Sequence, residues 1–153
     1  MRRTLASILV TLLFVGAFDV GSVAQTTAPW EGTWEVNVSK STYDPGPAPK
    51  SNRIVLKATA DGASLVTDGI GADGKPTHNE IIYRFDGKDY PFKGTVAAGT
   101  TRAYTRIDDR TYEYVTKVNG KVTTTSRVVT AADGKSRTQT TTGLTLRAEG
   151  STT

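Results

Sequence analysis

Apolar and polar residues alternate along most of the chain after residue 31, with the period of two that is typical of β-strands. In one clear example, Ile54, Leu56 and Ala58 alternate with Arg53 and Lys57. Successive side chains of a strand point to opposite faces, so such a segment has one apolar and one polar face. Val, Ile, Thr and Tyr, which favour strands, are frequent in these segments. We predict no helix after the leader, and strands over 32–39, 52–60, 63–69, 78–86, 89–94, 101–107, 111–119, 121–130 and 135–142.

Turn signals separate several of these segments. Asp-Gly and Asn-Gly pairs supply the positive φ angles of the tight turns that join antiparallel strands. Five pairs occur, at Asp61-Gly62, Asp73-Gly74, Asp86-Gly87, Asn119-Gly120 and Asp133-Gly134. We therefore expect successive β-hairpins.

A meander of eight or nine strands with one apolar face can bury that face by rolling into a barrel, which also removes exposed strand edges. The predicted fold class is all-β, an antiparallel up-and-down barrel of about eight or nine strands. A barrel of about eight strands is either filled by its own side chains or holds one small ligand, so strand number alone leaves both possibilities open.

The first 24 residues differ from the rest of the chain. Arg2 and Arg3 precede an apolar run from Leu5 to Phe18, and the small residues Ser22 and Ala24 follow. This three-part pattern is typical of a secretory signal peptide. The apolar run is shorter than the roughly 20 residues that a membrane-spanning helix needs. We expect cleavage after Ala24 and a location in the periplasm or outside the cell.

Cleavage would leave one domain over residues 25–143, followed by a divergent tail over 144–153. It would also change the formal net charge from +4 to +3, because the leader contains two arginines and one aspartate. The remaining basic residues are scattered, whereas nucleic-acid binding needs a basic cluster. The chain has no Cys and therefore no disulfide. We expect no nucleic-acid partner and no membrane span after cleavage.

Five segments in combination resemble a family of small secreted bacterial lipocalin-like proteins. They are "GTWEVNVSKSTYDPGPAPKS" (32–51), "DGIGADGKPTH" (68–78), "YRFDGKDYPFKG" (83–94), "RIDDRTYEYVTKVNGKV" (106–122) and "RVVTAADGKSRTQTTTG" (127–143). The resemblance implies an exported antiparallel barrel in the lipocalin style with a small ligand and no agreed enzymatic reaction.

The resemblance also concerns the two ends of the domain. Gly32-Thr33-Trp34 is similar to the Gly-x-Trp of lipocalins, whose indole plugs the closed end of the barrel. Trp34 is therefore a candidate plug, although its alternating position equally suits a core residue. After Gly143 the family continues into a last apolar strand, whereas this chain reads "LTLRAEGSTT". Either the barrel stays open, or the first residues of this tail form a short substitute strand, with Arg147 as a cap over Trp34.

Aromatic residues on the apolar faces are candidates to line the interior, where an aromatic ring packs against a ligand and a phenol hydroxyl orients it. The alternative is cross-strand aromatic packing. Tyr104 is a weaker candidate, because its face also carries Arg102 and Arg106. The predicted ligand-binding residues are Tyr83, Phe85, Tyr112 and Tyr114 in strands and Tyr43, as a lid, in the proline-rich loop.

No pattern of catalytic or metal-binding residues stands out. His78 is the only histidine and there is no Cys, so a zinc site cannot be assembled from imidazole and thiolate. "DGIGADGKPTHNE" lacks the ligand spacing of a calcium loop. Asp108 and Asp109 are adjacent in a predicted turn and point apart. We expect no enzyme activity, no metal and no cofactor.

Two functions remain. The first is a non-catalytic, lipocalin-like protein that binds a small, largely apolar ligand in its barrel. The second is an envelope protein-interaction or structural module with a side-chain-filled barrel, either a monomer or a dimer paired through strand edges. A third possibility, an enzyme with a tuned carboxyl group inside the barrel, is disfavoured because Glu35, Glu80 and Glu113 lie opposite the apolar faces.

Overall fold

A computed structural model describes residues 28–44 and 46–143 of the 153-residue chain. The predicted leader, the tail over 144–153 and Arg147 lie outside the described residues. The described part is all-β, as predicted, with one short 3-10 helix. Its elements are β1 (Gly32–Glu35), η1 (Val38–Lys40), β2 (Ser51–Ala58), β3 (Ala63–Ile70), β4 (Pro76–Tyr83), β5 (Asp86–Pro91), β6 (Lys93–Gly94), β7 (Thr100–Arg106), β8 (Thr111–Val118), β9 (Lys121–Thr130) and β10 (Arg137–Gly143).

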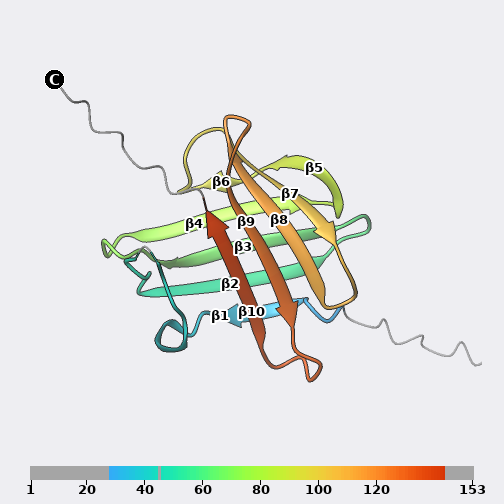
Figure 1. Cartoon of the computed structure of the whole chain (residues 1–153), viewed down its shortest axis with the longest axis horizontal. Helices are drawn as coiled ribbons and strands as arrows, with labels where there is room; N and C mark the ends of the chain where they lie inside the picture. The colour runs from blue at the N-terminus through green and yellow to red at the C-terminus, as the bar shows by residue number, and fades with distance from the viewer. Residues whose placement is uncertain (1–27, 45, 144–153) are drawn as a thin grey trace, which may run out of the picture.

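The strands form two antiparallel sheets of five strands each. The first sheet has the order β1-β2-β3-β4-β6, and the second has the order β10-β9-β8-β7-β5. The two sheets lie face to face, and in Figure 1 the strands of the second sheet cross those of the first. Each sheet is thus a meander, and the result resembles a β-sandwich.

Residues 86–94 connect the two sheets. β5 pairs with β7 of the second sheet, and β6, only one residue later, pairs with β4 of the first. Gly87 has a φ of 73° and lies where the β5–β7 register shifts, which marks a bulge. Gly94 has a φ of 122°, and a Cβ there would lie 2.0 Å from the His78 carbonyl oxygen. A continuous segment therefore bends around one side of the interior, and glycines permit the bend.

The opposite side of the interior is not closed by backbone hydrogen bonds within the described residues. β1 pairs only with β2, and β10 pairs only with β9. Even so, the two edge strands lie near each other, because the Arg137 guanidinium is 5.5 Å from the centroid of the Trp34 ring. In the described part the two sheets therefore do not close into the predicted barrel, and the molecule is open along the seam between β1 and β10.

Two expectations about local structure were wrong. The first strand ends at Glu35, not at residue 39, because Asn37 caps the 3-10 turn by accepting a hydrogen bond from the Lys40 amide at 3.2 Å. Asp86-Gly87 does not form a hairpin turn, because β4 and β5 belong to different sheets. The other four glycine turns do join consecutive antiparallel strands.

The core fills the space between the sheets. Most face assignments from alternation are confirmed: Leu56, Tyr83 and Tyr112 are almost fully buried, whereas Ile82, one residue from Tyr83, is 73% exposed. Ala58, assigned to the same face as Leu56, is exposed at the end of β2. The buried apolar set is Trp30, Ile54, Leu56, Ala63, Leu65, Ile81, Tyr83, Phe92, Tyr104, Tyr112, Tyr114 and Val128. Aromatic rings of both sheets meet in this core.

Candidate functional site

Two tyrosines, one from each sheet, form the centre of the core. The rings of Tyr83 on β4 and Tyr104 on β7 stack with centroids 3.6 Å apart, and both side chains are at most 1% exposed. Burial raises the pKa of both phenols well above the usual 10.0. Neither hydroxyl makes a hydrogen bond of good geometry with a described residue. The Arg102 guanidinium nevertheless lies close enough to the Tyr104 hydroxyl to oppose the effect of burial on its pKa. We call this stacked pair the tyrosine partition.

The strand β7 places charged residues on both sides of the partition. Arg102, Tyr104 and Arg106 alternate along β7 and therefore share its inner face. Arg102 lines one cavity and Arg106 lines another, whereas Tyr104 lines neither. The sequence showed that these three residues share a face, but the two arginines made that face look unsuitable for an interior. The structure shows that it is the interior face.

The first cavity, which we call the inter-sheet pocket, has a volume of about 190 Å³. Its walls come from both sheets and from the bend that connects them. The lining residues are Asn52, Ile54, Leu65, Thr67, Asn79, Phe92, Val96, Arg102, Tyr112, Tyr114, Arg137 and Gln139. Two of these are arginines and none is an aspartate or a glutamate.

Arg102 is held between aromatic rings. Its guanidinium carbon lies 3.8 Å from the centroid of the Phe92 ring and 4.7 Å from that of Tyr114. A guanidinium over an aromatic face is stabilised by the ring quadrupole. Its Nε atom is buried and has no hydrogen-bond partner among the described residues. The residues paired with Arg102 across the ladders are Tyr90 and Thr116, so no carboxylate faces it there.

Arg137 lies at the seam between the edge strands. It donates a hydrogen bond of 3.3 Å to the Tyr112 hydroxyl, and its guanidinium lies over the Trp34 ring. Burial raises the pKa of the Tyr112 phenol, and the nearby Arg137 charge opposes this effect. None of the ion pairs within residues 28–44 and 46–143 involves Arg102 or Arg137.

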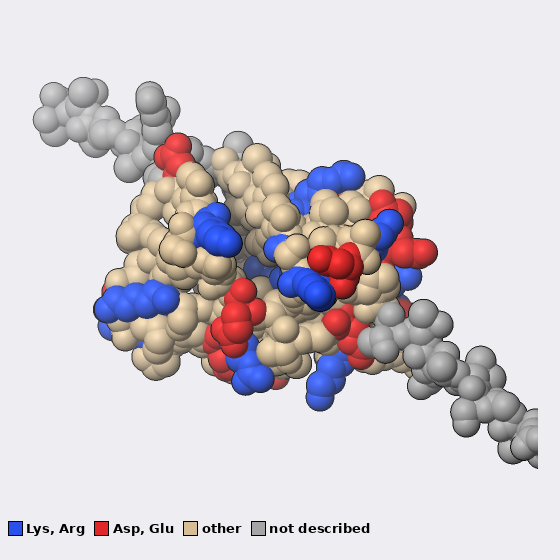
Figure 2. Space-filling view, turned by 90° about the horizontal axis from the view of Figure 1, so that it is seen from below, with Lys and Arg blue, Asp and Glu red and all other residues tan. Residues whose placement is uncertain are grey.

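Figure 2 views the molecule from the lower side of Figure 1, where β1 and β10 lie. This face has a hollow with Lys or Arg atoms in its depth. On the surrounding surface, basic and acidic side chains are interspersed and do not form a large patch of one sign. The basic atoms are therefore distinctive because of their depth and not because of their number.

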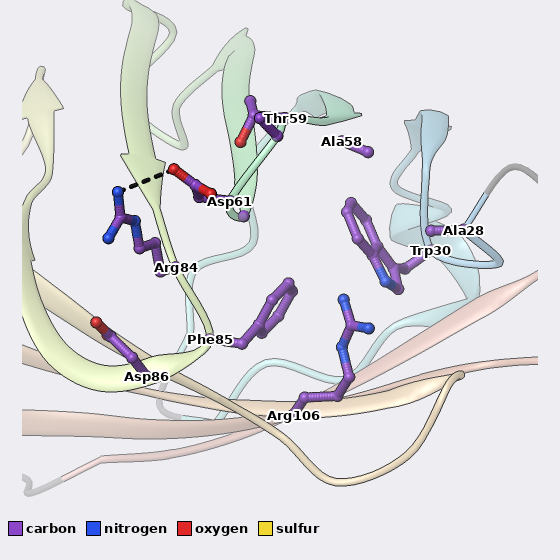
Figure 3. Close-up of a pocket in the computed structure, with 11 residues that line it drawn as sticks. Ala28, Trp30, Ala58, Thr59, Asp61, Arg84, Phe85, Asp86 and Arg106 are labelled. Atoms are coloured by element: carbon purple, nitrogen blue, oxygen red, sulfur yellow. Dashed lines mark hydrogen bonds and ion pairs between the residues drawn. The ribbon is translucent and has the colours of Figure 1, made fainter.

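The second cavity, which we call the open hollow, is larger and less enclosed, with a volume of about 650 Å³. Figure 3 shows Trp30, Phe85 and Arg106 around the same space. The Arg106 guanidinium is 4.5 Å from the Phe85 ring centroid. Here acidic residues accompany the basic ones: Asp61 pairs with Arg84 at 3.0 Å, and Asp86 also belongs to the lining.

The structure distributes the predicted ligand-binding residues over several places. Tyr112 and Tyr114 line the inter-sheet pocket, and Phe85 lines the open hollow. Tyr83 belongs to the partition and lines neither cavity. Tyr43, the predicted lid, is exposed in the loop between η1 and β2 and lines neither cavity.

Trp34, the candidate plug, is only partly buried. Its indole Nε1 donates a hydrogen bond to the Trp30 carbonyl at 3.1 Å. The more deeply buried indole belongs to Trp30, which is 2% exposed and which the sequence did not single out. Within the described residues Arg137 lies over the Trp34 ring, whereas the predicted cap, Arg147, lies outside the described residues.

The other polar groups considered from the sequence lie in exposed positions. His78 Nδ1 is 2.6 Å from an Asp68 oxygen on the neighbouring strand, and this hydrogen bond raises the pKa of His78 above 6.5. Asp108 accepts a hydrogen bond from the Arg110 amide, which lowers its pKa. Within the described ranges, no three His, Cys, Asp or Glu side chains are grouped to hold a metal ion. Those ranges also contain no helix long and apolar enough to cross a bilayer.

No family model matches this chain, and neither a curated protein nor a solved structure matches it significantly. The geometry of the two cavities is therefore what bears on the function of this protein.

Proposed function

We propose that this protein is an exported, lipocalin-like binding protein that holds one small molecule non-covalently in the inter-sheet pocket. The observation that carries the proposal is the composition of that pocket. Side chains of β2, β3, β4, β7, β8 and β10 converge on one space of about 190 Å³. Ligand pockets combine apolar and aromatic walls with polar groups that fix orientation, and here polar and charged side chains make up half of the lining.

The volume limits the size of the ligand. The pocket would hold about six water molecules at about 30 Å³ each. Drug-sized ligands occupy pockets of about 300 to 1,000 Å³, whereas a cavity of about 150 Å³ is large enough for benzene. The ligand is therefore of the size of a single ring with a small substituent, unless it extends out of the pocket through the open seam.

Binding would be driven by desolvation of apolar surface, at about 25 cal/mol per Å². Ile54, Leu65 and Phe92 supply such surface, and Asn52, Thr67 and Asn79 supply hydrogen-bonding groups. None of these groups is a nucleophile next to a base, which supports a non-catalytic role. Export rests on the leader pattern of the first 24 residues. The lipocalin likeness rests on the meander and on the resemblance of five sequence segments.

Native mass spectrometry of the protein purified from the cells that produce it tests this proposal. A small molecule that leaves only on denaturation is expected, and its mass would identify the ligand class. The protein should also be screened by NMR against single-ring fragments, with the amides of Thr67 and Asn79 as reporters of the pocket. A bare-chain mass together with no fragment-induced shift at those amides would overturn the proposal.

The second candidate function is a protein-interaction module. Strand β10 pairs on one side only within the described residues, and all of its residues except Arg137 are exposed. A free strand edge of this kind can accept a strand of a partner or of a second copy. Light scattering distinguishes the two functions: a dimer without a pocket ligand would favour the interaction module, and a monomer with a pocket ligand would favour the binding protein.

A further inference from the structure

We propose that the ligand of the inter-sheet pocket is a small organic anion, specifically a single-ring carboxylate, held by Arg102 and Arg137. This inference rests on the proposed function and specifies its ligand. It changes the expectation from the sequence, which was a largely apolar molecule.

The inter-sheet pocket has an excess of positive charge. The pocket contains two guanidinium groups and no carboxylate, and neither arginine takes part in an ion pair within the described residues. Both arginines are partly buried. Even partial withdrawal of a cation from water is unfavourable without a counter-charge. A bound anion would supply this counter-charge.

Arg102 also has a hydrogen-bond donor that no described residue uses. Arg102 Nε is buried and unpartnered among the described groups. A carboxylate accepts two parallel hydrogen bonds from a guanidinium, and such charge-assisted pairs are about twice as strong as neutral ones. The contacts of Arg102 with the Phe92 and Tyr114 rings restrict where its guanidinium can lie before any ligand arrives. Such restriction reduces the entropy lost on binding.

The apolar part of the pocket indicates what the rest of the ligand is like. The remaining walls include Ile54, Leu65 and Phe92, and the rings of Tyr112 and Tyr114 face the same space. A flat apolar ring would contact these groups, and a volume of about 190 Å³ holds one such ring with its carboxylate. Inorganic anions would use the arginines but leave the apolar walls without a partner.

The open hollow differs from the inter-sheet pocket in the charged residues that line it. Arg106 also lies over an aromatic ring, Phe85, but the hollow contains Asp61 and Asp86 as well. An arginine of the interior face is therefore not by itself a sign of an anion site. The uncompensated pair in the inter-sheet pocket is what distinguishes it.

The test uses benzoate, benzyl alcohol and inorganic phosphate as probes in calorimetric titrations of the full chain, with the Asn79 amide as the NMR reporter of location. Benzoate should bind at least about tenfold more tightly than benzyl alcohol, the equivalent of one charge-assisted hydrogen bond. Arg102→Gln and Arg137→Gln should each remove this preference. Arg106→Gln is the matched control, because Arg106 lies on the same face of β7, and should change benzoate affinity by less than about twofold.

The outcomes separate the inference from the proposed function. Equal affinity for benzoate and benzyl alcohol in the unaltered protein would overturn the anion assignment and leave the binding function intact, and this comparison needs no variant to fold. Phosphate binding as tight as benzoate binding would overturn the organic part of the assignment. If no probe binds, the charge of any molecule released in native mass spectrometry decides: a carboxylate supports the inference, and a neutral or cationic molecule overturns it. If no probe binds and no molecule is released, the proposed function itself is overturned.

Discussion

Arg102 and Arg106 lie four residues apart on the inner face of β7, on either side of the buried Tyr104. Arg102 faces the more enclosed of the two cavities, whose lining contains a second arginine and no acid. Arg106 faces a wider, open hollow whose lining also contains Asp61 and Asp86, and Asp61 pairs with Arg84. Two arginines on the same face of one strand therefore have different surroundings. The cavity around Arg102 is more enclosed and contains no acidic residue, whereas the cavity around Arg106 is more open and contains two.

Removing one ring of the tyrosine partition, which lies between Arg102 and Arg106, should have the largest effect on the free energy of unfolding. Tyr104→Ala deletes a fully buried ring that stacks on Tyr83, and such truncations lower the free energy of unfolding by about 3 to 5 kcal/mol. The free energy is measured by urea unfolding followed by circular dichroism. Tyr104→Phe is the control: it keeps the ring and removes a hydroxyl without a partner, so it should stabilise the protein by about 1 kcal/mol. Equal stability of the two variants would contradict the role of the ring.

High pH should weaken the partition without any mutation. Burial raises the pKa of Tyr83, Tyr104 and Tyr112 in the folded protein above the usual 10.0. Above about pH 10 the unfolded chain loses these protons and the folded protein keeps them, so stability falls as pH rises, by up to about 1.4 kcal/mol per pH unit for each phenol. Below that pH both states are protonated and these phenols add no pH dependence.

The measurement for the alkaline prediction is the melting temperature at about pH 9, 10 and 11, with the phenolate absorbance of the folded protein followed in parallel. Tyr104→Phe removes one of the three buried phenols and should make the decline shallower. A melting temperature that stays constant over this range would contradict the burial of the three hydroxyls.

Replacing Arg102 or Arg106 by an uncharged residue should have the smallest effects on the free energy of unfolding. The two effects should differ, because Arg102 lies in the inter-sheet pocket and Arg106 in the open hollow. Without ligand, Arg102→Met replaces an uncompensated cation between two rings and should raise the free energy of unfolding by about 1 kcal/mol. Arg106→Met, in the open hollow, should change it by less than about 0.5 kcal/mol. Thermal unfolding of both variants in the same buffer tests this difference. Destabilisation by Arg102→Met larger than that by Arg106→Met would contradict the expectation that the Arg102 charge lowers the stability of the ligand-free protein.

The sequence predicted the strands and their buried faces because these depend on local rules. Alternation assigned Leu56, Tyr83 and Tyr112 correctly to the inner face, since a period of two is fixed by the strand backbone itself. The exceptions were also local: the Asn37 cap ended the first strand early, and the Asp86-Gly87 pair formed a bulge in place of a hairpin. A single turn motif is compatible with either outcome, because the pairing of the flanking strands decides it.

The candidate site was predictable only in part. Tyr112 and Tyr114 were expected in the interior and do line the inter-sheet pocket, but Arg102 and Arg137 were not expected there. The sequence placed Arg102 on one face with Tyr104 and Arg106, and composition rules favour the exterior for such a face. Aromatic rings from other strands reverse that preference, since Phe92 and Tyr114 enclose the guanidinium.

Sequence patterns were sufficient for the all-β class, for the approximate position of most strands and for the buried side of the strands with clear alternation, because propensity and periodicity act within a few residues. Only the tertiary structure decided how the meander folds into two sheets with an open seam. It also decided which side chains of distant strands meet around one cavity. Both depend on pairings between segments far apart in the chain, such as β10 with β9 and the approach of Arg137 to Tyr112. Local patterns do not encode the resulting excess of positive charge in the pocket, because it arises from the combination of residues from six strands.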